Sequence, residues 1–188
     1  MPFKPVADWQ VHDRGGQRKY LNRAEYMRFL AAADRLDPGP RALCYTLALT
    51  GCRVSEALSL SVPQLDPENG ALIVKTLKRR RIVFRAVPIP LRLTRMLLDV
   101  PLHTGGRFWI MHRSSAWRLI KQTMKAAEIT GPMACCKGLR HSFGIRAIGC
   151  NVPPNLVQRW MGHATPSTTT IYLDAVGPEE RAFAHRMW

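Results

Sequence analysis

The sequence lacks the features that mark membrane proteins and secreted proteins. No apolar run in its 188 residues approaches the roughly 20 that a membrane-spanning helix needs, and residues 1–10 lack the apolar stretch of a secretory signal. The cysteines are odd in number, and no two have the separation of roughly two to four residues that structural zinc sites use. These absences argue against a membrane protein and a zinc module, and they predict a cytoplasmic protein with reduced thiols and no metal.

Acidic residues are also scarce. Aspartate and glutamate number 13 against 28 lysines and arginines, which gives a formal charge of +15, far more than solubility requires. Such an excess predicts a polyanionic partner. A ribosome-associated protein or a merely basic surface would show the same charge, so motifs have to decide among these classes.

The apolar pattern predicts a mainly α fold with a small antiparallel β-sheet, an α+β domain. Hydrophobic residues make up 46% of the chain, enough for the core of one domain. Residues 1–19 are polar with prolines and glycines, so we expect a flexible lead-in there and one compact domain over 20–188. The expected helices are 22–36, 41–49, 54–60, 91–98, 115–127, 138–148, 153–161, a short helix capped by Ser167 that carries Tyr172, and 179–187.

Between the third and fourth of these helices the sequence predicts a β-hairpin. Its strands would cover 71–75 and 82–89, and its tip would carry the cations Lys78, Arg79, Arg80 and Arg81. A lysine on such a tip can reach a DNA minor groove and protonate a departing 5′ oxygen. Lys78 is the candidate for that role and Lys75 the alternative, while the three arginines are expected to contact DNA phosphates.

Two arginines could clamp a phosphate. A phosphodiester repels nucleophiles, so breaking it without metal requires fixed cations, a nucleophile and an acid for the leaving oxygen. Arg53 lies at a predicted helix junction and Arg140 stands three residues after Lys137. The planar fork of arginine matches two phosphate oxygens and stays charged. Either arginine taken alone could equally be an ordinary surface or salt-bridged residue.

The nucleophile and its helpers would come from the last third of the chain. Tyr172 could lose its phenolic proton beside concentrated positive charge, or it could be a half-buried anchor for the last helices. His163 follows Gly162, which ends a predicted helix, and could donate to a phosphate or make a structural hydrogen bond. His141 points roughly 100° away from Arg140 on the same helix, which favours core packing or a supporting role.

Five short motifs in this order resemble the catalytic domain of the tyrosine recombinases, the phage integrase family. They are Thr50-Gly-Cys-Arg53-Val-Ser-Glu56, the basic hairpin, Lys137-Gly-Leu-Arg140-His141, Leu156 to His163, and Thr169-Thr-Ile-Tyr172. The resemblance covers about residues 21–188. It implies that the tyrosine attacks a phosphate of double-stranded DNA, leaving a 3′-phosphotyrosine and a free 5′ hydroxyl, without cofactor or metal.

The same resemblance assigns roles by position. Arg53 and Arg140 would be the clamp, His163 the late histidine, Tyr172 the nucleophile and Lys78 the acid, with Glu56 supporting the pocket. It also implies a homo-oligomer, a tetramer on DNA. Segment 178–188 could pack into a neighbouring subunit of that tetramer or on its own subunit.

The chain departs from the family pattern in two respects. Lys137 stands where the family usually has histidine, and a lysine is protonated near pH 7 and makes a poor general base. Residues 1–19 are too few to form the N-terminal core-binding domain that most members carry. Both departures motivate an alternative, a catalytically weak DNA-binding protein on the same fold. A type IB topoisomerase-like enzyme would share the chemistry.

Overall fold

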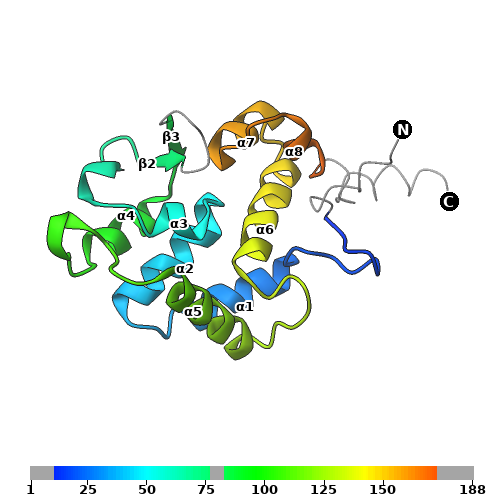
Figure 1. The fold of residues 1–188 in the computed structure, drawn as a ribbon, viewed down its shortest axis with the longest axis horizontal. Helices are drawn as coiled ribbons and strands as arrows, with labels where there is room; N and C mark the ends of the chain where they lie inside the picture. The colour runs from blue at the N-terminus through cyan, green and yellow to red at the C-terminus, as the bar shows by residue number, and fades with distance from the viewer. Residues whose placement is uncertain (1–10, 77–82, 173–188) are drawn as a thin grey trace.

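A computed structural model describes residues 11–76 and 83–172 of the chain. Across these residues the chain forms helices and one small three-stranded sheet (Figure 1), so the predicted α+β class is confirmed. The helices are α1 (Arg23–Ala33), α2 (Pro38–Thr50), α3 (Val54–Ala57), α4 (Leu91–Leu98), α5 (Arg113–Ala126), α6 (Cys136–Gly149), α7 (Pro154–Met161) and α8 (Ser167–Thr170). The strands are β1 (Leu65–Asp66), β2 (Ala71–Thr76) and β3 (Val83–Pro88), and the 3-10 turns are η1 (Val62–Gln64) and η2 (Thr104–Gly106).

Most helix boundaries agree with the local signals in the sequence. Asn22 caps α1, where its side chain accepts from the Glu25 N–H at 2.8 Å while the Glu25 carboxylate accepts from the Asn22 N–H. α4 begins and ends at the predicted residues. Gly162 ends α7 in the left-handed conformation, with φ of +64°, a region that glycine enters without steric cost.

Two helix predictions near the site were wrong in detail. α3 stops at Ala57, three residues before the expected end, because Leu58 to Leu60 turn toward η1. Ser167 is the first residue of α8 rather than its cap, and Tyr172 lies two residues beyond the end of α8. The tyrosine is therefore held by the turn that follows α8.

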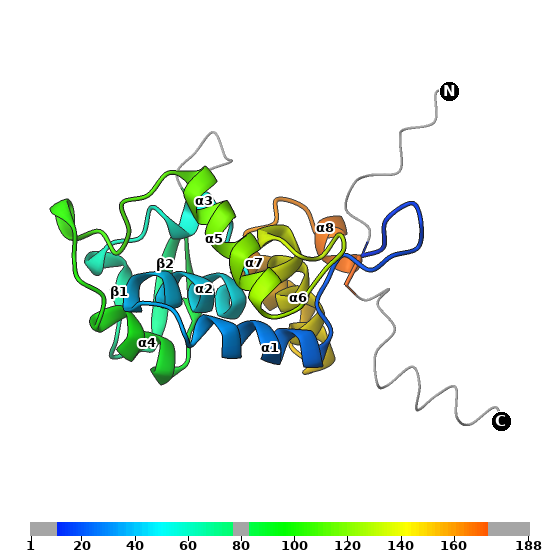
Figure 2. The same ribbon diagram turned by 90° about the horizontal axis from the view of Figure 1, so that it is seen from below.

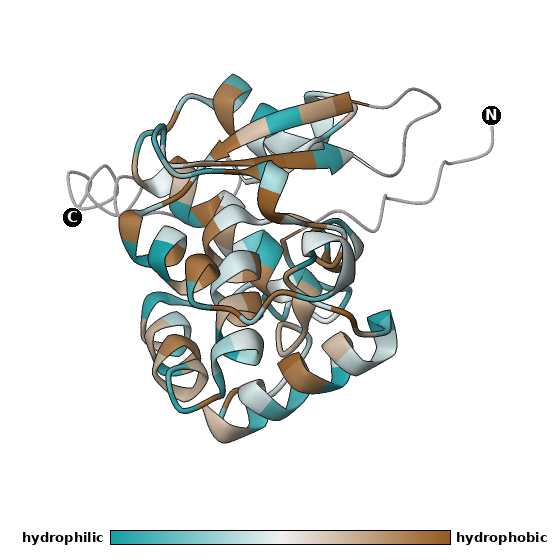
Figure 3. Cartoon of the chain, turned by 90° about the vertical axis from the view of Figure 1, so that its left-hand side faces the viewer, coloured by the Kyte–Doolittle hydropathy of each residue, from teal (hydrophilic) through white to brown (hydrophobic). Residues whose placement is uncertain are grey.

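The sheet is antiparallel in the order β1-β2-β3. β2 and β3 pair from Ala71 opposite Pro88 to Thr76 opposite Val83, as the hairpin prediction requires. Figure 3 shows the two long strands as a layer at one side of the helices. Residues 77–82 lie outside the described part, so the predicted roles of Lys78, Arg79, Arg80 and Arg81 stay predictions.

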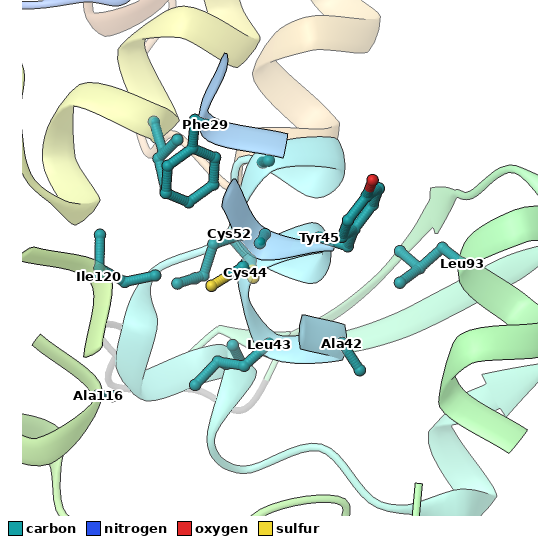
Figure 4. Packing of buried hydrophobic residues seen from close by; sticks show 14 of the residues in the cluster. Phe29, Ala42, Leu43, Cys44, Tyr45, Cys52, Leu93, Ala116 and Ile120 are labelled. Atoms are coloured by element: carbon teal, nitrogen blue, oxygen red, sulfur yellow. The ribbon is translucent and has the colours of Figure 1, made fainter. Parts of the chain in front are cut away.

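The main hydrophobic core surrounds α2. This helix packs against α1, α4 and α6. Figure 4 shows Phe29 of α1, Leu93 of α4 and Ile120 of α5 close to buried α2 residues such as Leu43. In the described ranges no helix is long and apolar enough to cross a membrane.

A second hydrophobic cluster joins α6, α7 and the turn after α8. We call it the second cluster; it consists of Val11, Phe143, Ala147, Val157, Met161 and Tyr172. Figures 1 and 2 show the segment from residue 11 and α8 at the same end of the molecule. Residues 11–19, the described part of the expected lead-in, contribute buried Val11 to this cluster, and the Leu21 N–H that follows donates to Ser142 Oγ at 2.7 Å.

Candidate active site

Arg53 and Glu56 occupy the junction between α2 and α3. Gly51 ends α2 in the left-handed conformation, and Arg53, in extended backbone, precedes α3 as its cap. The carboxylate of Glu56 accepts from the Arg53 backbone N–H at 2.9 Å and from Arg53 Nη1 at 3.0 Å. Glu56 is fully buried, whereas the side chain of Arg53 keeps a quarter of its surface exposed. Arg53 therefore lies at a helix junction, where the sequence places it, and its partly exposed side chain is bonded to a buried carboxylate.

A second arginine binds the same carboxylate. Arg85 of β3 donates from Nη2 to Glu56 Oε2 at 2.6 Å. Burial opposes ionisation of Glu56, but the charges and hydrogen bonds of Arg85 and Arg53 outweigh it and hold the pKa of that carboxyl below its ordinary value. The sequence prediction missed Arg85. The signal was present, because Val87 and Ile89 are buried along this strand and period two places Arg85 on the same face.

Arg140 connects α6 to the ends of two other helices. Its Nη1 donates to the Gly51 carbonyl at 2.6 Å and its Nη2 to the Met161 carbonyl at 2.8 Å. Burial, and then the neighbouring charge of Arg53, lower the pKa of Arg140 to about 10, so it stays charged at neutral pH. The two predicted clamp arginines thus lie close enough for their charges to interact, although 87 positions separate them in the sequence.

His163 is held at the turn after α7. Its Nδ1 lies 2.8 Å from Thr169 Oγ1 in α8, and its ring stacks on that of Tyr172 with centroids 6.1 Å apart. Burial, followed by the charges of Arg140 and Arg53, lowers the pKa of His163 to about 3. The imidazole is therefore neutral at physiological pH and has one N–H to donate and one nitrogen to accept.

Tyr172 is buried within the site, with 2% of its surface exposed. Its hydroxyl lies 3.3 Å from Nδ1 of His141. Burial raises the pKa of Tyr172 to about 12, against the opposing charges of Arg140 and Arg53. The ring rests directly on α6, since a Cβ built on Gly144 would lie 2.4 Å from its Cε2. In this conformation the phenol is neutral and covered, so it is closed to any substrate.

His141 lies in the interior, in keeping with its predicted angle on the helix, and it also touches the candidate nucleophile. It is 4% exposed, and burial together with the charges of Lys137 and Arg140 lowers its pKa to about 4. Lys137 is exposed in the first turn of α6, one turn before Arg140. Lys75 is half-buried in β2, opposite Phe84.

A cavity of about 320 Å³ opens beside these groups, between β3 and α7. Arg85 and His163 form part of its wall, and Gln158 and Arg159 of α7 line it as well. Within residues 11–76 and 83–172 no group of three or more histidine, cysteine, aspartate or glutamate side chains is arranged to hold a metal. The nitrogen donors in its wall are two guanidinium groups, one imidazole and two side-chain amides, and its lining as the structure describes it holds no carboxylate, which suits an anion.

The family model described as the phage integrase family matches residues 19–176. The chain belongs to this family. The match includes both clamp candidates, His163 and Tyr172, so the tyrosine recombinase resemblance seen in the motifs is confirmed.

Curated members of the family resemble this chain over most of its length. The tyrosine recombinase XerD of Bifidobacterium longum is 32% identical over 156 residues, which cover 74% of this chain and 50% of the relative. The tyrosine recombinase XerC of Lacticaseibacillus casei is 30% identical over 166 residues, covering 79% of this chain and 54% of the relative. The chain thus spans about half the length of the curated relatives it matches.

Solved structures of recombinases share the fold. The catalytic domain of bacteriophage HP1 integrase superimposes with a TM-score of 0.68 at 25% identity, covering 89% of this chain and 93% of that one. The XerA recombinase gives a TM-score of 0.75 at 23% identity, covering 89% of this chain and 64% of that one. The phage integrase catalytic-domain fold is therefore common to all three.

Proposed function

We propose that this chain is a site-specific DNA recombinase that cuts and rejoins strands of double-stranded DNA through Tyr172. One observation carries the proposal. Arg53, Arg140, His163 and Tyr172 come from four separate segments, yet the two arginines act electrostatically on each other, on His163 and on the tyrosine. A tyrosine surrounded by fixed cations is the arrangement that phosphoryl transfer to a phenol requires.

In the proposed cleavage step, the phenolic oxygen of Tyr172 attacks the scissile phosphorus. A P–O bond to tyrosine forms while the bond to the 5′ oxygen breaks, leaving a 3′-phosphotyrosine. Arg53 and Arg140 neutralise the phosphate oxygens, and His163 donates its N–H to one of them. The phenolic proton passes to a base or to water, and the 5′ oxygen takes a proton from Lys78. Rejoining reverses these transfers, so no energy source is consumed.

Lys137 has a different role in the proposal from that of a base. It is exposed one turn before Arg140, and a lysine ammonium has three donors and no acceptor, so we place it as a third cation on the phosphate rather than as the proton acceptor. Lys75 and the arginines at 79–81 are proposed to contact neighbouring phosphates. The tetramer expected through segment 178–188 and the cytoplasmic location stay predictions, and segment 178–188 lies outside the described residues.

The experiment that tests the function is trapping of the covalent intermediate. The protein is incubated with nicked duplexes taken from DNA flanking its own gene, and denaturant-resistant adducts are mapped by mass spectrometry. We expect an adduct on Tyr172, none with Tyr172→Phe, and unchanged DNA affinity in that variant. Tyr20→Phe is the matched control, because Tyr20 packs beside the same second cluster and should leave adduct formation intact.

The same experiment separates the alternative of a catalytically weak DNA-binding protein. That alternative predicts salt-dependent DNA binding and no adduct with any duplex. An adduct on a residue other than Tyr172, or strand exchange by Tyr172→Phe, would contradict the assignment of the nucleophile.

A further inference from the structure

Arg85 is a buried cation of β3 to which the sequence analysis assigned no role. It is 6% exposed and its guanidinium makes three hydrogen bonds to three different elements. Nε donates to the Trp160 carbonyl of α7 at 2.8 Å, Nη1 to Thr76 Oγ1 of β2 at 2.8 Å, and Nη2 to Glu56 Oε2 of α3 at 2.6 Å. Because all three nitrogens already have protein acceptors and little surface is open, Arg85 is a poor candidate for contacting DNA itself.

The ion pair between Arg85 and Glu56 supports the orientation of Arg53. The Glu56 carboxylate has no exposed surface, and each of its oxygens accepts from an arginine side chain. Oε1 accepts from Arg53 Nη1, and Oε2 accepts from Arg85 Nη2 and from the Arg53 backbone N–H. A buried carboxylate that loses one of two cations retains its desolvation cost and reorients toward the remaining donor. Loss of Arg85 would therefore let Glu56 pull Arg53 inward, away from the site of the phosphate.

Arg85 also sets the position of the turn that carries His163. A Cβ built on Gly162 would lie 2.9 Å from Arg85 Cζ, so the end of α7 packs directly on the guanidinium. The adjacent carbonyls of Trp160 and Met161 accept from Arg85 and Arg140 respectively. These carbonyls belong to the C-terminal end of α7, where the helix dipole favours cations. His163 follows immediately.

We propose that Arg85 is a positioning residue of the strand-cleavage reaction, holding Glu56 and thereby Arg53 in register with the end of α7 that presents His163. The inference rests on the proposed function and adds to it the residue that connects the clamp arginine Arg53 to the turn that carries His163. Since a misplacement of about 1 Å can cost about 100-fold in rate, a residue that never touches the substrate can control the chemical step.

The test compares Arg85→Met and Arg85→Lys with native protein in single-turnover cleavage of the nicked duplex, with DNA affinity measured separately. We expect Arg85→Met to cleave about 100-fold more slowly while binding DNA within about threefold of native affinity. Arg85→Lys should recover part of the rate, because one ammonium can reach the carboxylate but cannot serve three acceptors. The matched control is Arg92→Met, which removes an arginine paired with Asp34 outside the site and should cleave at the native rate.

A double variant distinguishes positioning from a general structural role. If Arg85 acts through the clamp, adding Arg85→Met to Arg53→Lys should cost less than about tenfold further, whereas independent effects would multiply. Multiplying effects, or a parallel fall of affinity and rate, would overturn the inference. Native-like cleavage by Arg85→Met would overturn it as well.

A milder variant covers the case in which Arg85→Met does not fold. Thr76→Val removes one acceptor and keeps the ion pair to Glu56, and we expect cleavage to fall roughly tenfold, within the range that lost orientation produces. Unchanged cleavage by folded Thr76→Val would then overturn the inference. Failure of the proposed function is visible separately, because the native protein itself would form no adduct at Tyr172.

Discussion

Two buried histidines of the site are uncharged at neutral pH. The pKa of His141 falls to about 4 and that of His163 to about 3, mainly through burial and then through nearby lysine and arginine charge. A neutral imidazole can rest against the phenol of Tyr172 without adding to the positive charge on the clamp. The same burial makes the folded state sensitive to acid, because protonating either ring inside the protein is costly.

Acid should therefore destabilise the protein through these two residues. In the unfolded chain a histidine takes a proton near pH 6.5, whereas His141 and His163 take one only near 4 and 3 when folded. Between those values the unfolded state binds more protons, so stability rises with pH and is lost on acidification. We expect the free energy of unfolding to drop by about 1.4 kcal/mol per pH unit for each histidine below pH 6.5.

Urea denaturation at a series of pH values from 4.5 to about 7.5 measures this slope. The pair His141→Gln and His163→Gln should flatten it, while His103→Gln, a change at an exposed histidine, should keep the native slope. A double variant with the native slope would show that the acid sensitivity arises elsewhere.

At the scale of single residues, the sequence identified the candidate site residues that belong to recognisable motifs. It missed the residues and contacts that depend only on tertiary packing. Arg53, Arg140, His163 and Tyr172 were identifiable because each stands beside a turn or helix signal and matches a family motif. Arg85 was missed because the candidate hairpin cations were taken only from residues 75–81, although strand alternation assigns Arg85 to the buried face of β3. The contact between His141 and Tyr172 joins residues 31 positions apart, and no local pattern encodes it.

Helix α6 provides the surface on which Tyr172 rests. It carries Arg140 and His141 in its first half, and one turn later Gly144 leaves room for the tyrosine ring. The candidate nucleophile is therefore covered by the same helix that supplies Arg140, one of the proposed clamp residues. For the proposed reaction the ring has to leave α6.

Filling that space should expel the ring. In Gly144→Ala the new Cβ would lie 2.4 Å from Tyr172 Cε2, so we expect a loss of about 1–3 kcal/mol of stability and greater exposure of the phenol. Thermal denaturation and nitration of Tyr172, mapped by mass spectrometry, measure the two effects. Gly149→Ala on the same helix is the control, because a Cβ there meets no atom within 4 Å. Equal stability and equal nitration of the two variants would show that the Tyr172 ring shifts to accommodate the new methyl group and stays buried against α6.

Local sequence signals predicted which helices and strands form better than they predicted where each one begins and ends. α4 matched its predicted bounds and α7 began one residue late, since both have clear proline or glycine boundaries. α3 ended early, and β1, only two residues long, was not predicted, because pairing with β2 rather than its own sequence makes it a strand. Such short elements depend on tertiary contacts that a local pattern does not contain.

At the scale of the whole molecule, the two hydrophobic clusters are unequal. The main cluster combines α1, α2, α4, α5 and the sheet, whereas the second cluster consists of few residues and includes the candidate nucleophile Tyr172. If Tyr172 acts as the proposed nucleophile, its departure from this position removes one of the two aromatic side chains of the second cluster. A site that has to open is expected to belong to the less stable part of a protein.

Amide hydrogen exchange should therefore differ between the helices of the main cluster and those of the second cluster. We expect amides of α7 to exchange at least about tenfold faster than those of α2, because they open without unfolding the main core, a difference of about 1.4 kcal/mol in opening free energy. Val157→Ala, in the second cluster, should speed exchange in α7 and leave α2 unchanged. Val87→Ala removes the same methyl groups from an equally buried position in the main cluster, so it should speed exchange in α2 with little effect on the local opening of α7. The contrary result is equal protection of α2 and α7, with both substitutions speeding exchange in the two helices alike. It would mean that the chain opens as one cooperative unit. In the proposed reaction Tyr172 would then reach DNA only after bound DNA rearranges the helices around it.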